Sequence, residues 1–434
     1  MQTITIEPLR WQEDPSRITI HANDSQLAVY YQVTSPKSVA AVCCGRPVEE
    51  LPRLLPILAP SHHLAAALAL DRLFAVDPPE LAQNMRAGLL QAQYCSSHLR
   101  QIFFLLTSRQ DPFSGFHDSR RRFSSARISQ RMPERIMHHA ALAQEAEDIL
   151  GGRHDHPLTA VAGGVSRFLK DGYYERLADL SASLLNFSLE LAEFMRSEIL
   201  SAEGLLSPWS HVELPTLPGL CLSVDGQPSL CDPAGGSRKP FDADQLGAAV
   251  DLQQEAWSYQ PFAYLKEKEW KGVDASDGFF LVGPLARFNA AQTASTPLAE
   301  EERQRMIECL GTPPVYRLPA AFGAMTIELV QAAEMLQALS SVEKLTGPAL
   351  RTIPDGIGQQ RSTWAALEGP RGLTWHQYQV DDNGIVENVT VLDARAANNA
   401  FKCRLAKQIV GAALARDEKP AVIKDHVSVA LLPF

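Results

Sequence analysis

Apolar residues recur at helical spacing along much of this chain, and the pattern predicts several buried helices. The longest predicted helices cover residues 81–106 and 174–200. Shorter helices are predicted over residues 64–74, 133–150 and 322–345, and paired prolines or glycines follow the first two of these. We therefore expect a body that is built mainly from helices.

Strict alternation of apolar and polar residues predicts β-hairpins near both ends of the chain. One hairpin is expected over residues 18–31, around an Asn-Asp-Ser turn, and another over residues 375–392, around an Asp-Asp-Asn-Gly turn. A third, smaller hairpin is expected around Asp225-Gly226. The expected fold class is α+β, predominantly α: a helical body with small β-hairpins.

We expect a single domain over residues 1–434. Its predicted parts are an N-terminal hairpin region (1–48), a helical core (49–350) and a C-terminal hairpin and tail (351–434). Hydrophobic residues make up 45% of the chain and charged residues 21%, which is ordinary globular composition and excludes a chain that is disordered throughout.

The charge and hydropathy of the chain limit the kinds of partner and the cellular compartment that we expect. The formal net charge of −10 leaves no whole-chain basic footprint, so no nucleic-acid partner is expected. No run of 18 apolar residues predicts a membrane span, and residues 1–11 lack the apolar core of a secretory signal. We therefore expect a cytoplasmic protein, with Arg120, Arg121 and Arg122 on an exposed loop.

The sequence offers few motifs for cofactor or metal binding. It contains no Walker loop, no strand-borne G-x-G-x-x-G and no C-x-x-C, and its seven cysteines are scattered. Cys43-Cys44 and the pairs His62-His63 and His138-His139 are direct neighbours, and neighbours on a helix rarely face one metal ion. From these residues we expect no bound metal.

Three segments resemble, in the same order, signature motifs of the nickel–iron hydrogenase large subunits. Arg53, His62 and Ala65 match the R, H and A of R-I-C-G-x-C-P-x-x-H-x-x-A. Residues 151–165 match G-G-R-x-x-H-P-x-x-x-x-x-G-G-V at every fixed position, and residues 368–372 match E-[A/G]-P-R-G, with His376 shortly after. The resemblance runs from about residue 4 to residue 430 and implies the large-subunit fold.

The same resemblance shows where the chain departs from the family. Family members hold their metals with four cysteine thiolates, and the corresponding positions here are Leu55, Leu58, Val427 and Ala430. Apolar side chains offer no soft donor for a nickel–iron pair. We expect hydrocarbon to fill the former metal cavity, where each buried side chain stabilises the fold by about 1–3 kcal/mol. The chain also stops at Phe434, before the family's final histidine.

Arg371, with Pro370 and His62, forms the candidate binding site that remains. The resemblance implies that this arginine and proline line a pocket for the cyanide and carbonyl ligands of iron, and a guanidinium can donate hydrogen bonds to cyanide. The alternative is that Pro370-Arg371-Gly372 only shapes a turn before the hairpin at residues 375–392.

These observations predict a large-subunit homologue that is not an enzyme, has no catalytic residue and acts in nickel–iron hydrogenase assembly. HupK/HoxV-type maturation accessory proteins are similar in this respect. No cofactor is expected to bind stably, although the iron–cyanide–carbonyl group could be held transiently by Arg371 with a thiolate of Cys43 or Cys44. The expected partners are hydrogenase maturation proteins or hydrogenase subunits.

Two other interpretations stay open at this stage. The chain could be a structural or regulatory docking subunit of a hydrogenase-like complex that carries no metal. It could also be a quinone-binding relative like the large-subunit homologue of respiratory complex I, which kept the fold and lost the cysteines. The retained motifs at residues 151–165 and 368–372 favour the hydrogenase line over this last interpretation.

Overall fold

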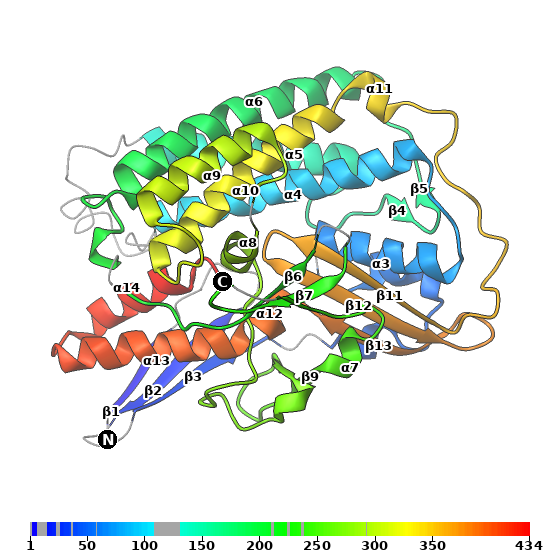
Figure 1. Cartoon of the computed structure of the whole chain (residues 1–434). Helices are drawn as coiled ribbons and strands as arrows, with labels where there is room; N and C mark the ends of the chain where they lie inside the picture. Colours follow the sequence, from blue (N-terminus) through cyan, green and yellow to red (C-terminus); the bar gives the residue numbers. More distant parts are fainter. Residues whose placement is uncertain are drawn as a thin grey trace.

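Most of the chain is described by a computed structural model (Figure 1). The described residues are 2–6, 15–22, 27–35, 38–57, 59–107, 131–209, 212–223, 226–235, 238–291 and 293–434.

A group of long helices forms the larger part of the molecule. In Figure 1, α6, α9, α10 and α4 form the upper part of the molecule, and the small sheets lie below them. The long helices are α3 (Pro60–Leu73), α4 (Glu80–Thr107), α5 (Arg131–Gly151), α6 (Tyr173–Phe194), α9 (Pro297–Leu310), α10 (Leu318–Leu339), α13 (Asn399–Ala415) and α14 (Pro420–Leu431). The short helices are α1 (Val39–Cys43), α2 (Leu51–Leu54), α7 (Leu246–Ala249), α8 (Pro284–Ala290), α11 (Val342–Leu345) and α12 (Ala394–Ala397).

Helix α4 lies at the centre because it is apolar at successive turns. It packs against α5 and α10, and its Leu81, Met85 and Leu89, four residues apart, are almost fully buried. A Cβ at Gly88 would lie 3.2 Å from a methyl group of Leu150, so this glycine lets α4 and α5 approach closely. Burial of these helix faces supplies most of the core.

The described strands form small antiparallel sheets. One contains β1 (Gln2–Ile6), β2 (Ser16–Ala22) and β3 (Leu27–Val33), and another contains β11 (Ser362–Gly369), β12 (Gly372–Val380) and β13 (Val386–Leu392). Helix α13 packs against β3, and helix α3 packs against β11 and β12. The remaining strands are β4 (Ala160–Val161), β5 (Gly164–Val165), β6 (Gly219–Leu222), β7 (Pro228–Cys231), β8 (Arg238–Pro240), β9 (Val250–Gln253) and β10 (Phe262–Leu265).

The α+β, predominantly helical fold class is confirmed, and most predicted elements are present. The predicted hairpins correspond to β2–β3, β6–β7 and β12–β13, although their residues 23–26 and Asp225 lie outside the described residues. The prediction of a single helix over residues 322–345 was wrong. Helix α10 ends at Leu339, and the Ser341 hydroxyl accepts the Lys344 N–H at the start of α11.

Two elements near the predicted site are missing from the sequence prediction. Strand β11 contains two alanines and a glycine, so it lacks the β-branched pattern of a strand, and pairing with β12 holds it in place. Helix α14 was not predicted, although Pro420 stands at its first turn. Among the described residues, no helix is both long and apolar enough to cross a membrane.

The two adjacent glycines of the second motif allow a close backbone contact. Gly163 has a φ of +76°, and its carbonyl accepts a hydrogen bond of 2.8 Å from the Thr352 N–H. A Cβ at Gly163 would lie 2.0 Å from the Thr352 carbonyl oxygen, which no real side chain tolerates. The next residue, Gly164, is equally close to the backbone of residues 350–351. These glycines therefore have a structural role.

We expect Gly163→Ala to lower the free energy of unfolding by about 2–4 kcal/mol, because the methyl group adds a backbone clash to the strain of a positive φ. Gly172→Ala is the matched control. Gly172 has a φ of +82° but open space around it, so its variant carries only the conformational cost of about 1 kcal/mol. Urea unfolding of the two variants measures the difference, and equal losses would contradict this account.

Candidate functional site

The third motif folds into a two-residue turn between β11 and β12. Gly369 pairs with Gly372 across the two strands, and Pro370 and Arg371 occupy the turn between them. Gly372 has a φ of +141°, and a Cβ there would lie 2.5 Å from a methyl carbon of Val282. The interpretation of this segment as a turn is therefore correct, and the turn decides where the Arg371 side chain goes.

Arg371 joins the turn to α4 and to the C-terminal residues. Its Nη1 donates a hydrogen bond of 3.3 Å to the Leu432 carbonyl. With the Gln101 amide in the orientation that satisfies both of its groups, the Gln101 oxygen accepts from Arg371 Nη2 at 2.6 Å and its nitrogen donates to Leu432 O at 2.9 Å. The half-buried guanidinium is therefore held in one orientation.

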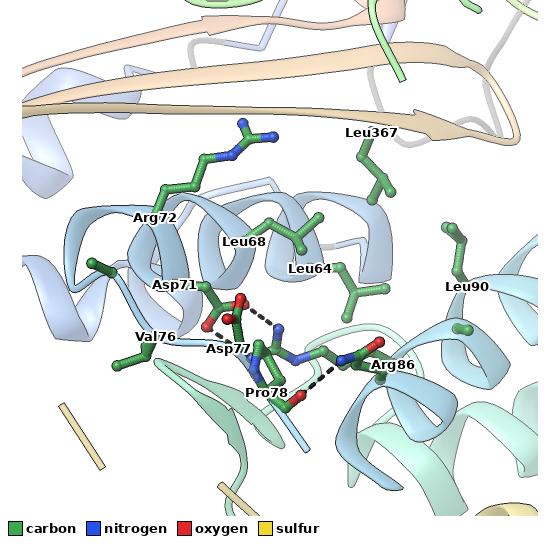
Figure 2. Close-up of a pocket in the computed structure, with 13 residues that line it drawn as sticks. Leu64, Leu68, Asp71, Arg72, Val76, Asp77, Pro78, Arg86, Leu90 and Leu367 are labelled. Carbon is green, nitrogen blue, oxygen red and sulfur yellow. Dashed lines mark hydrogen bonds and ion pairs between the residues drawn. The ribbon is translucent and has the colours of Figure 1, made fainter. Parts of the chain in front are cut away.

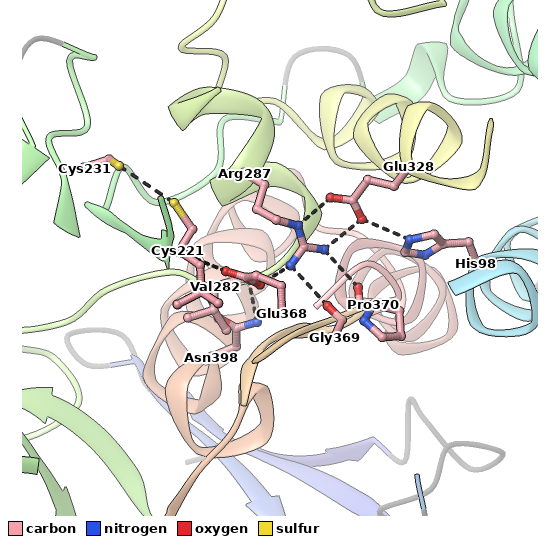
Figure 3. Close-up of polar contacts among 11 residues, drawn as sticks. His98, Cys221, Cys231, Val282, Arg287, Glu328, Glu368, Gly369, Pro370 and Asn398 are labelled. Atoms are coloured by element: carbon pink, nitrogen blue, oxygen red, sulfur yellow. Dashed lines mark hydrogen bonds and ion pairs between the residues drawn. The ribbon is translucent and has the colours of Figure 1, made fainter. Parts of the chain in front are cut away.

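A second arginine, Arg287 on α8, lies at the centre of a largely buried charge cluster near this turn (Figure 3). It donates to both oxygens of Glu328 on α10, at 2.6 and 2.8 Å, and at 2.5 Å to Glu368 on β11. It also donates to the Gly369 carbonyl at 3.2 Å and to the Pro370 carbonyl at 3.4 Å. One guanidinium thus holds the start of the motif and the turn.

Each carboxylate of this cluster has a further partner. The fully buried His98 on α4 lies 3.0 Å from Glu328 through its Nε2, and the Leu222 N–H of β6 donates to Glu368 at 2.8 Å. Burial lowers the pKa of His98, so this imidazole is neutral and donates through Nε2 to the carboxylate.

The two carboxylates differ in how strongly the cluster stabilises their charge. Burial acts to raise the pKa of Glu328, but the Arg287 charge and the hydrogen bonds from His98 and Arg287 outweigh it, and the pKa lies below its ordinary value. For Glu368, burial dominates over Arg287, and the pKa is raised. Burial also opposes the charge of Arg287, but the two carboxylates raise its pKa well above the ordinary value.

The histidines of the first and third motifs meet in the interior. His62 Nδ1 on α3 lies 3.0 Å from His376 Nε2 on β12, and His376 Nδ1 lies 2.6 Å from the Tyr378 hydroxyl. On the other side, His62 Nε2 lies 3.8 Å from a carboxylate oxygen of Asp393, which caps α12. All four side chains are buried, so the predicted site residue His62 belongs to an interior polar chain that runs from Asp393 to Tyr378.

Burial and neighbouring charges shift the pKa values of three of these side chains and so decide which of them are charged. Burial, with the nearby His62, lowers the pKa of His376 well below the ordinary value, and burial raises the pKa of Tyr378 well above it. Burial also opposes the charge of Asp393, but Arg395 and His62 hold its pKa at about 2. This row of buried side chains therefore carries a negative charge at Asp393, and its groups at His376 and Tyr378 are neutral.

The first and second motifs are tied to each other by His63 and Arg53. His63 Nδ1 donates to the Pro52 carbonyl at 2.7 Å, and its Nε2 accepts the Ala160 N–H at 2.9 Å. Arg53 donates to the Leu158 carbonyl at 3.4 Å, and His156 Nε2 donates to the Arg53 carbonyl at 2.8 Å. These motif residues thus hold two distant parts of the fold together.

The four positions that the resemblance equates with the family's thiolates are apolar, and those within the described residues are buried. Leu55 is 4% exposed, and Val427 and Ala430 are fully buried, whereas Leu58 lies outside the described residues. Leu55 packs in a small cluster with Cys43 and Tyr378, whereas Val427 and Ala430 belong to the main core. They therefore fill two apolar clusters rather than one.

These residues do not fit a resident nickel–iron pair. Leu55, Val427 and Ala430 have no donor atom, and no group of three or more His, Cys, Asp or Glu side chains that could hold a metal exists among the residues outside the gaps. Cys43 does not supply a replacement, because burial, with Cys44 beside it, raises the pKa of its thiol to about 11. Cys44 is exposed on the surface.

A cleft of about 510 Å³ opens between α3, α4 and β11 (Figure 2). Leu64, Leu68 and Leu367 form its apolar wall, and the buried ion pair between Asp71 and Arg86, 2.5 Å apart, lies at its edge. Neither Arg371, Pro370 nor His62 lines this cleft. The predicted site residues therefore lie outside the large cleft.

Sequence reasoning missed the residues that organise the turn. Arg287, Glu328 and His98 lie far apart in the chain and in no motif, so only the packing of α8, α10 and α4 brings them together. Glu368 was quoted as part of a motif, but its role as a partner of Arg287 was not predicted. A charged residue within an apolar helical stretch, such as Glu328, was the one available signal.

The comparisons with known proteins agree with the fold and the motifs. No family model matches the chain. The iron-sulfur subunit of an F420-non-reducing hydrogenase from Archaeoglobus profundus is 25% identical over 430 residues, covering 92% of this chain and 86% of the relative. The corresponding F420-non-reducing hydrogenase subunit of Methanothermobacter thermautotrophicus is 27% identical over 423 residues, with 92% and 85% covered.

Solved structures extend this similarity to the whole fold. An NAD+-reducing [NiFe]-hydrogenase in the H2-reduced state superposes with a TM-score of 0.82 at 23% identity, covering 100% of this chain and 97% of that one. The chain is therefore hydrogenase large-subunit-like in sequence and in fold. The prediction that it is not an enzyme is contradicted, because these relatives are named as subunits of hydrogenases, which are enzymes.

We expect Arg287→Met to lower the free energy of unfolding by about 3–5 kcal/mol at pH 7, because it leaves Glu328 and Glu368 buried without a cation. The pKa values of both carboxylates should then rise, so protonation at pH 5 should recover part of the loss. Urea unfolding at the two pH values tests this. Arg176→Met removes the exposed partner of Glu145 and should cost less than about 1 kcal/mol; a similar cost for both variants would refute the role of Arg287.

Histidine burial predicts loss of stability in mild acid. Burial lowers the pKa of His63 from 6.5 to about 4, so between these values the unfolded chain binds a proton that the folded chain excludes. The contribution of His63 is therefore present above about pH 6.5 and is lost, at up to about 1.4 kcal/mol per pH unit, as the pH falls towards 4. His63→Gln should remove this part of the pH dependence in unfolding experiments, and an unchanged slope would show that His63 does not carry it.

Proposed function

We propose that this hydrogenase large-subunit-like chain acts in nickel–iron hydrogenase assembly, where it transiently holds the iron–cyanide–carbonyl group as cargo. The observation that carries the proposal is the fixed guanidinium of Arg371. It projects from the turn of the E-G-P-R-G motif and is oriented by Gln101 and the Leu432 carbonyl. The supporting comparisons are the relatives named as hydrogenase subunits.

The chemistry of Arg371 suits such cargo. Cyanide bound to iron carries negative charge on an outward nitrogen, and a planar guanidinium offers it charge-assisted hydrogen bonds with a defined direction. Pro370 holds the turn rigidly and adds an apolar wall beside the carbonyl ligand. Arg287 supports this arrangement from behind, because it binds the carbonyls of Gly369 and Pro370.

Weak binding of the iron group would allow the chain to pass it on to a partner protein. Leu55, Val427 and Ala430 offer no thiolate, so contacts to the cyanide ligands would provide most of the binding. Cargo that is held through its outer ligands can leave when a partner supplies thiolates. The partners of this step would be hydrogenase maturation proteins or hydrogenase subunits.

We expect the purified chain, co-expressed with the hydrogenase maturation machinery, to show infrared bands of cyanide and carbonyl. Arg371→Met should reduce these bands at least tenfold relative to protein, and Arg371→Lys should retain part of them, because lysine keeps the charge without the planar fork. Arg361→Met is the matched control: Arg361 pairs with Asp382 at the opposite end of the β11–β12 pair, so its bands should remain.

Absence of the bands in the wild-type chain, with iron at background level, would refute carriage of this cargo. Nickel and iron analysis together with a hydrogen-uptake assay on the same preparation distinguishes cargo from a working metal centre. Stoichiometric nickel with hydrogen uptake would replace the proposed role with direct catalysis.

A second candidate function is that of a docking subunit in a hydrogenase-like complex. The names of the relatives favour it, since each is a subunit of a larger enzyme. Affinity purification that recovers a hydrogenase small subunit with this chain, without iron, would support docking over cargo handling.

A further inference from the structure

Two cysteines outside the motifs face each other on the β6–β7 hairpin. Cys221 Sγ and Cys231 Sγ lie 3.9 Å apart, and both side chains are buried, with 5% and 7% exposure (Figure 3). In the antiparallel register Cys231 lies opposite Gly219, so Cys221 is its diagonal neighbour on the same face. The remaining cysteines of the described chain have no sulfur–sulfur contact of this kind.

We infer that Cys221 and Cys231 form a peroxide-sensitive dithiol, in which Cys231 is the attacking thiolate and Cys221 the resolving thiol. A disulfide has a sulfur–sulfur bond of about 2.05 Å, so the sulfurs need to approach by less than about 2 Å. Both residues lie on the β6–β7 hairpin of a small three-stranded sheet, with their side chains on the same face. This site lies outside the proposed cargo-handling function.

The surroundings distinguish the two sulfurs. The hydrogen bond with Cys221 and the charge of Arg238, which lies opposite Cys231 on β8, outweigh burial and lower the pKa of Cys231 to about 7. The hydrogen bond with Cys231, together with burial, raises the pKa of Cys221. The pKa of Cys231 therefore lies below that of Cys221, so Cys231 is the sulfur that ionises first, as an attacking group requires.

The access route favours a very small oxidant. Cys231 lines a cavity of about 10 Å³ together with Asp232 and Tyr316, which is roughly the space of one water molecule. Hydrogen peroxide, with two heavy atoms, requires the least widening of this cavity, whereas a disulfide such as oxidised glutathione is far larger. We therefore assign a hydroperoxide as the class of oxidant.

The reaction balances with one hydrogen peroxide per pair. The Cys231 thiolate attacks one peroxide oxygen, the O–O bond breaks, and the leaving hydroxide takes up a proton to become water, which leaves Cys231 as a sulfenic acid. The Cys221 sulfur then attacks the Cys231 sulfur, the S–O bond breaks, and the oxygen leaves as a second water with the Cys221 proton. Two thiols supply the two electrons that reduce the peroxide.

Oxidation would reach the motif through one hydrogen bond. Leu222, directly after Cys221, donates its N–H to Glu368, and Glu368 binds Arg287 (Figure 3). Moving Cys221 towards Cys231 displaces this N–H from the carboxylate. Oxidation of the dithiol would therefore alter the contacts of Glu368 with Arg287, which supports the turn.

Peptide mass spectrometry after hydrogen peroxide treatment of the full chain tests the pair. Both cysteines fall in the tryptic peptide of residues 197–238, so the disulfide appears as a mass loss of about 2 Da that resists alkylation and is reversed by dithiothreitol. Cys309→Ser, which removes an exposed cysteine, should leave this product unchanged. Cys221→Ser should stop at a Cys231 sulfenic acid, which reacts with dimedone that is present while the treated chain is unfolded in denaturant, and Cys231→Ser should yield neither product.

Two results would overturn the inference. One is peroxide oxidation of Cys309 or Cys44 while residues 197–238 stay as a dithiol; the other is a dimedone adduct on Cys221 in place of Cys231. Hydrogen exchange tests the link to the motif. The Leu222 amide should exchange at least tenfold faster in the oxidised chain, and an equal rate would show that the dithiol is not coupled to Glu368.

Discussion

The buried guanidinium of Arg287 is the interaction on which the arrangement around the turn depends. It neutralises Glu328 and Glu368 and donates to the carbonyls of Gly369 and Pro370, so one side chain joins α8, α10 and β11. A buried carboxylate without a cation is costly, and two of them would not remain ionised at this site. The position of Arg371 follows from this, because Arg371 extends from the turn that Arg287 holds.

Residues of the signature motifs connect distant parts of the fold through hydrogen bonds and ion pairs. His63 and Arg53 connect the first motif to the second, and Asp71 accepts the Gly163 N–H at 2.7 Å while it pairs with Arg86. His62 connects the first motif to His376 after the third. Residues that are placed this way are needed for the fold whether or not a metal is bound. Their presence therefore does not require a metal, and Leu55, Val427 and Ala430 offer no thiolate for one.

The charges are distributed so that the interior carries few isolated ones. Glu328 has Arg287 and His98, Asp393 has Arg395 and the nearby His62, and His376 and Tyr378 are neutral. A site with this balance can orient an anionic ligand through Arg371 without placing a new uncompensated charge in the core. The hairpin with Cys221 and Cys231 lies at the edge of the same network, next to Glu368.

Local spacing was enough to predict α3, α4, α5, α6 and most of α10, the three hairpins and the helical fold class, because periodicity depends on near neighbours in the chain. It did not predict α9, α13 or α14. The motifs also identified Arg371, Pro370 and His62 as residues to examine. Spacing could not predict β11, whose alanines have no strand preference until β12 pairs with them. Nor could it bring His98, Arg287, Glu328 and Glu368 together. Their contacts join residues up to 230 positions apart, and only the packing of the helices, with the cost of burying unpaired charge, decides such contacts.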